Sequence, residues 1–132
     1  MSSIQVSPML RTGLAADAIV SGACGLLMLA APAMLSTLTR LPEGLLFGSG
    51  LGLMIYVAIV GWMARRATLP RAGVFAVVAC NALWAVDCLW AAFGGLFPVT
   101  PVGVAFLVAQ ALAVAVFAEW QYMGLRRSAA AA

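Results

Sequence analysis

Residues 72–97 read AGVFAVVACNALWAVDCLWAAFGGLF, an apolar run that contains a single charged side chain, Asp87. An α-helix rises 1.5 Å per residue, so about 20 apolar residues cross the ~30 Å hydrocarbon layer of a bilayer. The run does not alternate between apolar and polar residues, as a strand of a membrane β-barrel would. It therefore predicts a transmembrane helix.

Three similar runs lie on either side of this one. They cover residues 14–34, 45–63 and 102–123. The connections at 36–44, 64–71 and 98–101 are short, and short connections make consecutive helices antiparallel neighbours. We predict an all-α fold: one transmembrane domain over residues 1–132, built as an up-down-up-down four-helix bundle.

The composition supports a membrane protein. Hydrophobic residues make up 65% of the chain and charged residues 8%, whereas soluble domains carry about 25% charged residues. The net charge is +3, but the basic residues are arginines at the ends of apolar runs. That placement is typical of membrane topology, so we expect the lipid bilayer as a partner and no nucleic acid.

The arginines also predict an orientation. Arg11, three arginines in the 64–71 connection and two in the C-terminal tail fall on one side, against Arg40 alone on the other. Cytoplasmic loops are enriched in arginine and lysine. We therefore expect a bacterial inner-membrane protein with both termini in the cytoplasm. Ala31-Pro32-Ala33 resembles a signal-peptide cleavage site, but the preceding apolar run exceeds the usual length of 7–15 residues. We favour a retained first helix.

Polar side chains within the runs are predicted to form two levels, at 1.5 Å per residue from the cytoplasmic ends. Asp17 and Glu119 form the shallow level, where water or loop arginines can be reached. The deep level contains Ser49, Asn81, Asp87 and Gln110. Whether Asp17 and Glu119 touch is left open.

Asp87 is the strongest single candidate for a functional residue. An ionised aspartate at mid-membrane costs about 2.5–3.5 kcal/mol, so we expect Asp87 to be neutral and hydrogen-bonded to Gln110 or Ser49. Such bonds average only ~0.6 kcal/mol, which explains the residue weakly. Trp84 and Trp90 lie three residues to either side and could hold a lipophilic cation, although tryptophans in an interfacial belt are the simpler interpretation.

Small residues at a spacing of four mark candidate packing faces. Gly48 and Gly52 form a GxxxG pair in the second run. The first run has two further pairs, Ala18 with Gly22 and Ser21 with Gly25. Such pairs let helix backbones approach closely, within one chain or between chains.

The residue types argue against catalysis. Histidine and lysine are absent, and Cys24, Cys80 and Cys88 form no CxxC pair. An intramembrane enzyme needs a nucleophile, a base or a metal. We expect no catalytic, cofactor-binding or metal-binding residues, no cofactor and no enzymatic activity.

Two functions remain. The first is a bundle that acts by association, either as an accessory subunit of a larger membrane complex or as a homo-oligomer. The alternative is a small dimeric transporter, linked to protons or cations, that uses Asp87 as its intramembrane carboxylate.

Overall fold

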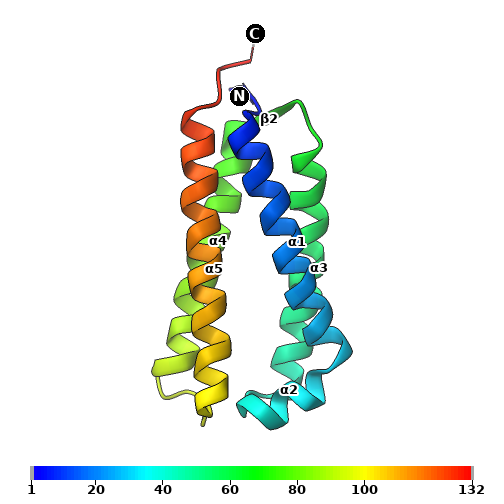
Figure 1. Ribbon diagram of the computed structural model, residues 1–132, viewed down its shortest axis with the longest axis vertical. Helices are drawn as coiled ribbons and strands as arrows, with labels where there is room; N and C mark the ends of the chain where they lie inside the picture. The colour runs from blue at the N-terminus through cyan, green and yellow to red at the C-terminus, as the bar shows by residue number, and fades with distance from the viewer. Residues whose placement is uncertain (1, 132) are drawn as a thin grey trace.

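A computed structural model of the chain describes residues 2–131 and is built from helices (Figure 1). The helices are α1 (Pro8–Ala30), α2 (Pro32–Thr39), α3 (Glu43–Ala64), α4 (Arg71–Phe93) and α5 (Pro101–Arg126). Two short strands, β1 (Ser3–Gln5) and β2 (Thr68–Pro70), complete the structure. The prediction of an all-helical fold is confirmed.

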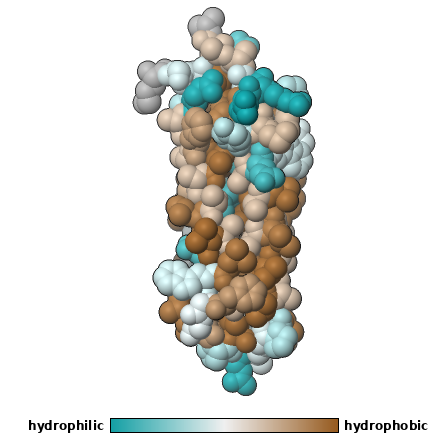
Figure 2. All heavy atoms as spheres, turned by 90° about the vertical axis from the view of Figure 1, so that its left-hand side faces the viewer, coloured by the Kyte–Doolittle hydropathy of each residue, from teal (hydrophilic) through white to brown (hydrophobic). Residues whose placement is uncertain are grey.

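Four of these helices, α1, α3, α4 and α5, are long and apolar enough to cross a membrane. Their exposed surfaces are mostly apolar, and on the face shown in Figure 2 the hydrophilic residues lie mainly at the two ends of an apolar band. Large side chains such as Ile19, Ile55 and Phe93 are more than three-fifths exposed on this band. A surface of this kind suits contact with lipid rather than with water.

The first predicted run, residues 14–34, is divided between two helices. Helix α1 begins earlier, because Pro8 occupies its first turn and the Ser7 hydroxyl caps it by accepting the Leu10 N–H. It ends at Ala30 and the short α2 begins at Pro32, since proline cannot continue a helix without losing a backbone hydrogen bond. Helix α4 likewise ends at Phe93 rather than at residue 97.

The long helices alternate in direction, and both chain termini lie at the same end of the molecule (Figure 1). Helix α1 packs against α3, α4 packs against α5, and the two pairs meet mainly through α1 and α5. Among the described residues α3 and α4 make almost no close backbone contact. The short connection between them therefore does not make them packed neighbours, contrary to the prediction.

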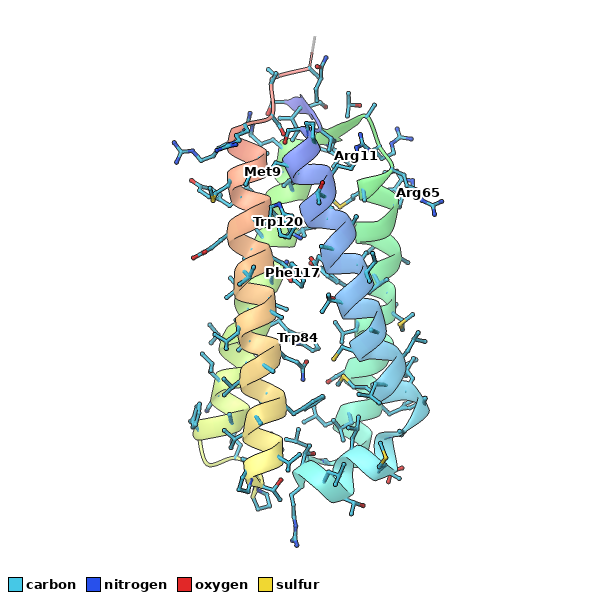
Figure 3. The ribbon with its side chains drawn as sticks, viewed as in Figure 1. Met9, Arg11, Arg65, Trp84, Phe117 and Trp120 are labelled. Carbon is cyan, nitrogen blue, oxygen red and sulfur yellow. The ribbon has the colours of Figure 1, made fainter. Side chains whose placement is uncertain are left out.

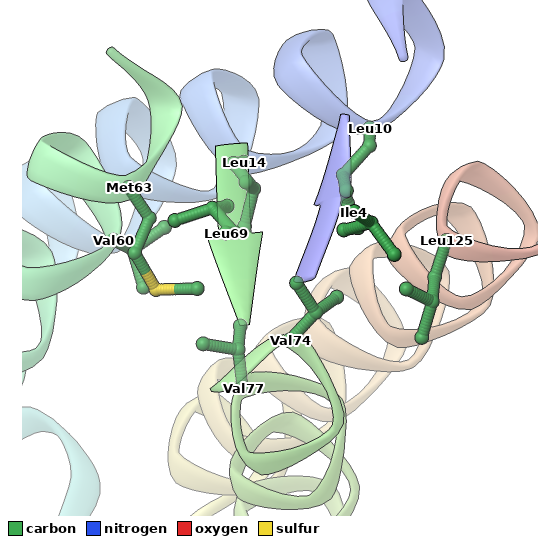
Figure 4. Packing of buried hydrophobic residues seen from close by; sticks show 9 residues of the cluster. All are labelled: Ile4, Leu10, Leu14, Val60, Met63, Leu69, Val74, Val77 and Leu125. Atoms are coloured by element: carbon green, nitrogen blue, oxygen red, sulfur yellow. The ribbon is translucent and has the colours of Figure 1, made fainter. Parts of the chain in front are cut away.

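At the end that holds the termini, the bundle is filled by a tight apolar cluster. Strands β1 and β2 pair antiparallel with Ile4 opposite Leu69, and Ile4 also bridges to Ala130. Both Ile4 and Leu69 point into the cluster, where they meet Leu14 and Val74 (Figure 4). All four side chains are almost completely buried. This end of the bundle is closed.

Glycines allow close approaches between helices, but only some of the predicted positions are among them. A Cβ added to Gly25 would lie 3.5 Å from the carbonyl oxygen of Gly50, and a Cβ added to Gly50 would lie 3.2 Å from the carbonyl oxygen of Gly25. Helices α1 and α3 therefore touch at these two glycines. Gly22 faces Val57 of α3, and Ala18 is half-buried. Gly48 and Gly52, in contrast, have nothing within 4 Å of an added Cβ. That pair faces outward and does not pack within the bundle.

Candidate functional site

The completely buried Asp17 carboxylate lies at the centre of a hydrogen-bond network that joins all four long helices. Its Oδ1 accepts from the Ser21 hydroxyl at 2.8 Å. Its Oδ2 accepts from the Tyr56 hydroxyl at 2.6 Å, the Asn81 amide at 3.0 Å and the Gln121 amide at 2.7 Å. The Asn81 amide also donates to Gln121 Oε1 at 2.9 Å. We call these five residues the Asp17 network.

The donor set of the Asp17 network fits an ionised carboxylate. A carboxylate only accepts hydrogen bonds and offers about four lone-pair sites, and four donors reach Asp17. The Tyr56 distance is in the short range of O–H···O⁻ bonds. Among residues 2–131 every deeply buried side-chain nitrogen or oxygen has a partner. The buried polar atoms of the network are therefore all hydrogen-bonded.

This placement corrects the predicted shallow level. Asp17 is completely buried, whereas Glu119 is exposed on α5 and does not reach it. Glu119 precedes Gln121 by two residues, which turns its side chain by about 200° around the helix. Arg11, the nearest arginine on α1, donates to the carbonyl oxygens of Ala64 and Arg66. Asp17 is therefore held by neutral groups from within the bundle.

Four members of the network were assigned elsewhere or missed. Asn81 was predicted to belong with Asp87, and Ser21 was predicted to be a packing residue. Tyr56 and Gln121 were not singled out. The signal for Gln121 is its spacing: it continues the buried stripe of Val114, Phe117 and Gly124 on α5, with steps of three and four residues.

A cavity of about 300 Å³ lies nearer the other end of the bundle, where α3 and α4 stand apart. It is lined by Asp87, Ser49 and Gln110, three of the four residues predicted to form the deep level, together with Trp84, Trp90 and several apolar side chains. We call it the Asp87 pocket. The structure thus places these three residues around one space, on α4, α3 and α5.

Asp87 differs from the prediction in its partners. Its side chain is exposed, and within residues 2–131 it has no hydrogen-bond partner. Gln110 instead accepts a hydrogen bond from Trp84 Nε1 at 3.2 Å. The next residue on α4, Cys88, is the one that faces the core. The pocket therefore presents a carboxylate that the protein itself leaves without a partner.

The three cysteines and the possible metal ligands do not form a further candidate site among residues 2–131. Cys24 and Cys88 are packed among apolar side chains, and Cys80 is exposed on α4. Within residues 2–131 no group of three or more histidine, cysteine, aspartate or glutamate side chains is placed to hold a metal ion. The two acidic sites are the features that need an explanation.

Comparisons with known protein families, with curated proteins and with solved structures give no match. The functional argument therefore rests on the geometry of the Asp87 pocket and of the Asp17 network.

Proposed function

We propose that this chain is an integral membrane protein that binds a small organic cation in the Asp87 pocket, as a transporter of such compounds must. The four long helices would cross the inner membrane of a bacterium, with both termini on the cytoplasmic side. The segregation of the arginines supports this orientation, and the apolar band of the long helices supports the membrane location.

One observation carries the proposal: Asp87 is a carboxylate without a partner among residues 2–131, in a cavity lined mostly by apolar and aromatic side chains. An ionised aspartate at membrane depth costs about 2.5–3.5 kcal/mol, and a bound cation would offset this cost. The indoles of Trp84 and Trp90 also line the cavity, and indole faces attract organic cations. At about 300 Å³ the pocket has the volume of a small ligand site.

Charge should therefore decide what binds. Benzyltrimethylammonium and neopentylbenzene have nearly the same shape, but only the first is a cation. We expect benzyltrimethylammonium to quench tryptophan fluorescence of the purified protein in mild detergent with saturation. Asp87→Asn should weaken this binding by about tenfold or more, equivalent to at least 1.4 kcal/mol. Neopentylbenzene should bind the parent protein and Asp87→Asn with the same affinity.

The asparagine variant is a clean comparison because Asp87 has no hydrogen bond to lose within residues 2–131. Equal affinity of the two proteins for benzyltrimethylammonium would overturn cation binding at Asp87. Proteoliposomes extend the test to transport: uptake of the labelled cation should require the parent protein and should be lost in Asp87→Asn.

A second candidate function, association with another membrane protein or with a second copy, is favoured by the outward glycines. Gly48 and Gly52 lie on α3 beside Ser49 of the pocket, and an added Cβ at either would meet nothing within 4 Å. A partner helix could approach this face closely and place a basic side chain near Asp87.

Native mass measurement in mild detergent tests this candidate. The parent protein should migrate as a complex, and Gly48→Leu or Gly52→Leu should dissociate it. Ala76→Leu is the matched control, because Ala76 is exposed on α4 outside the glycine face. A parent protein that is monomeric and recovered without partners from its own membrane would exclude association.

A further inference from the structure

A second, much smaller cavity of about 30 Å³ lies between the Asp87 pocket and the Asp17 network. Ser21, Cys24 and Phe117 are among its lining residues. Its volume is sufficient for a water molecule, which needs roughly 10–15 Å³ measured with a water-sized probe and two to four polar partners. The Ser21 hydroxyl and the Gln110 amide supply polar atoms there.

Trp84 and Gln110 line both cavities. The hydrogen bond from Trp84 Nε1 to Gln110 joins α4 to α5 between the two spaces. The side chains of Trp84 and Phe117 project into the region between the two helix pairs (Figure 3). Trp84 and Gln110 therefore separate the Asp87 pocket from the small cavity.

The small cavity leads directly to the Asp17 network, because Ser21 lines the cavity and donates to Asp17 Oδ1 at 2.8 Å. On the side of the termini, Leu10, Leu14 and Val60 are completely buried in the tight apolar cluster. The small cavity therefore offers water a route to Asp17 from the pocket end.

We infer that the Trp84–Gln110 pair is a barrier in a one-sided water path from the Asp87 pocket to Asp17. When the Trp84 indole moves, water from the pocket enters the small cavity and reaches Ser21 and the carboxylate behind it. Water then reaches Asp17 from one side of the membrane only. The path extends the proposed pocket function, but its test does not depend on ligand binding.

Cys24 reports on this path because it lines the small cavity. In a Cys80→Ser, Cys88→Ala background it is the one cysteine left in the sequence. The probe is 2-hydroxyethyl methanethiosulfonate, which is polar and uncharged, and the readout is the mass of the modified protein with time. We expect Trp84→Ala to raise the labelling rate of Cys24 by about tenfold or more, as removal of a barrier would.

Trp90→Ala is the matched control, since Trp90 lines the Asp87 pocket but not the small cavity. It should leave the labelling rate of Cys24 near that of the parent. Equal rates in Trp84→Ala and Trp90→Ala would overturn the inference. To exclude general unfolding, Val77→Cys replaces Cys24 as the reporter in the closed apolar cluster, where it should stay unlabelled in Trp84→Ala.

The two proposals can fail independently, because the labelling assay contains no cation. Cation binding is measured by the fluorescence quenching of the parent and of Asp87→Asn, both of which keep Trp84. If these two proteins bind benzyltrimethylammonium equally while the contrast between the two tryptophan variants holds, cation binding at Asp87 fails and the barrier stands.

Discussion

The two aspartates within the long helices, Asp17 and Asp87, show how strongly one position on a helix can decide the role of a residue. Asp17 is completely buried and receives four hydrogen bonds from neutral donors. Asp87 is exposed and lines a pocket. Since both lie in apolar runs, the difference comes from the direction in which each side chain points.

A change from aspartate to asparagine should therefore destabilise the fold at residue 17 and leave its stability unchanged at residue 87. In Asp17→Asn an amide N–H₂ replaces an acceptor and faces the donors of Asn81 and Gln121. Leaving buried polar groups unsatisfied costs about 1–3 kcal/mol, and hydrogen bonds to charged groups are at the upper end. We expect the free energy of unfolding, measured by titration with a denaturing detergent, to fall by about that amount.

Asp87→Asn is the control, and it should unfold like the parent because Asp87 has no hydrogen bond to lose within residues 2–131. A stability loss at residue 87 with none at residue 17 would show that the structural assignment of the two aspartates is reversed.

At the scale of the elements, the helices are held together by glycines that admit a neighbouring backbone. An added Cβ on Gly124 of α5 would lie 2.7 Å from the backbone of Leu10 on α1. The contact joins the two helix pairs near the closed end, where Ser7 also donates to the Gly124 carbonyl at 2.9 Å. The α1–α5 interface therefore depends on a glycine that the sequence analysis did not select.

Gly124→Ala should destabilise the fold, because its methyl group can be accommodated only by moving two backbones apart. Overpacking of this kind typically costs about 1–3 kcal/mol, read again from denaturing-detergent titration. Gly52→Ala is the matched control on α3, where an added Cβ meets nothing within 4 Å. Similar stabilities for the two variants would contradict the close approach of α1 and α5.

At the scale of the whole molecule, the two ends of the bundle are built differently. The end that holds both termini is closed by the strand pair and an apolar cluster (Figure 4). The other half contains the Asp87 pocket, where α3 and α4 stand apart. This asymmetry gives the proposed binding site access from one half of the molecule.

The proposed orientation predicts where reporter enzymes will be active. Alkaline phosphatase folds only outside the bacterial cytoplasm. Fused after Arg40 it should be active, whereas fused after Ala67 in the arginine-rich connection or at the C-terminus it should be inactive. The physical reason is the retention of arginine-rich segments on the cytoplasmic side. Active fusions at the C-terminus and in the arginine-rich connection would mean that the orientation is inverted.

The sequence by itself determined the helical class and the order of the long helices. Runs such as residues 72–97 are long enough to cross a bilayer, and backbone groups in lipid must be satisfied within helices or closed barrels. The end of α1 at Ala30 also has a local cause, because Pro32 cannot donate the backbone hydrogen bond that would continue the helix.

Only the tertiary structure decided which aspartate is buried and which glycines touch. In a soluble helix a polar face and an apolar face show which side points inward. These helices are apolar all round, since lipid and protein interior favour the same residues, so the rotation of each helix depends on packing. That rotation turned Asp17, Tyr56 and Gln121 towards each other and left Asp87 and Gly52 facing outward.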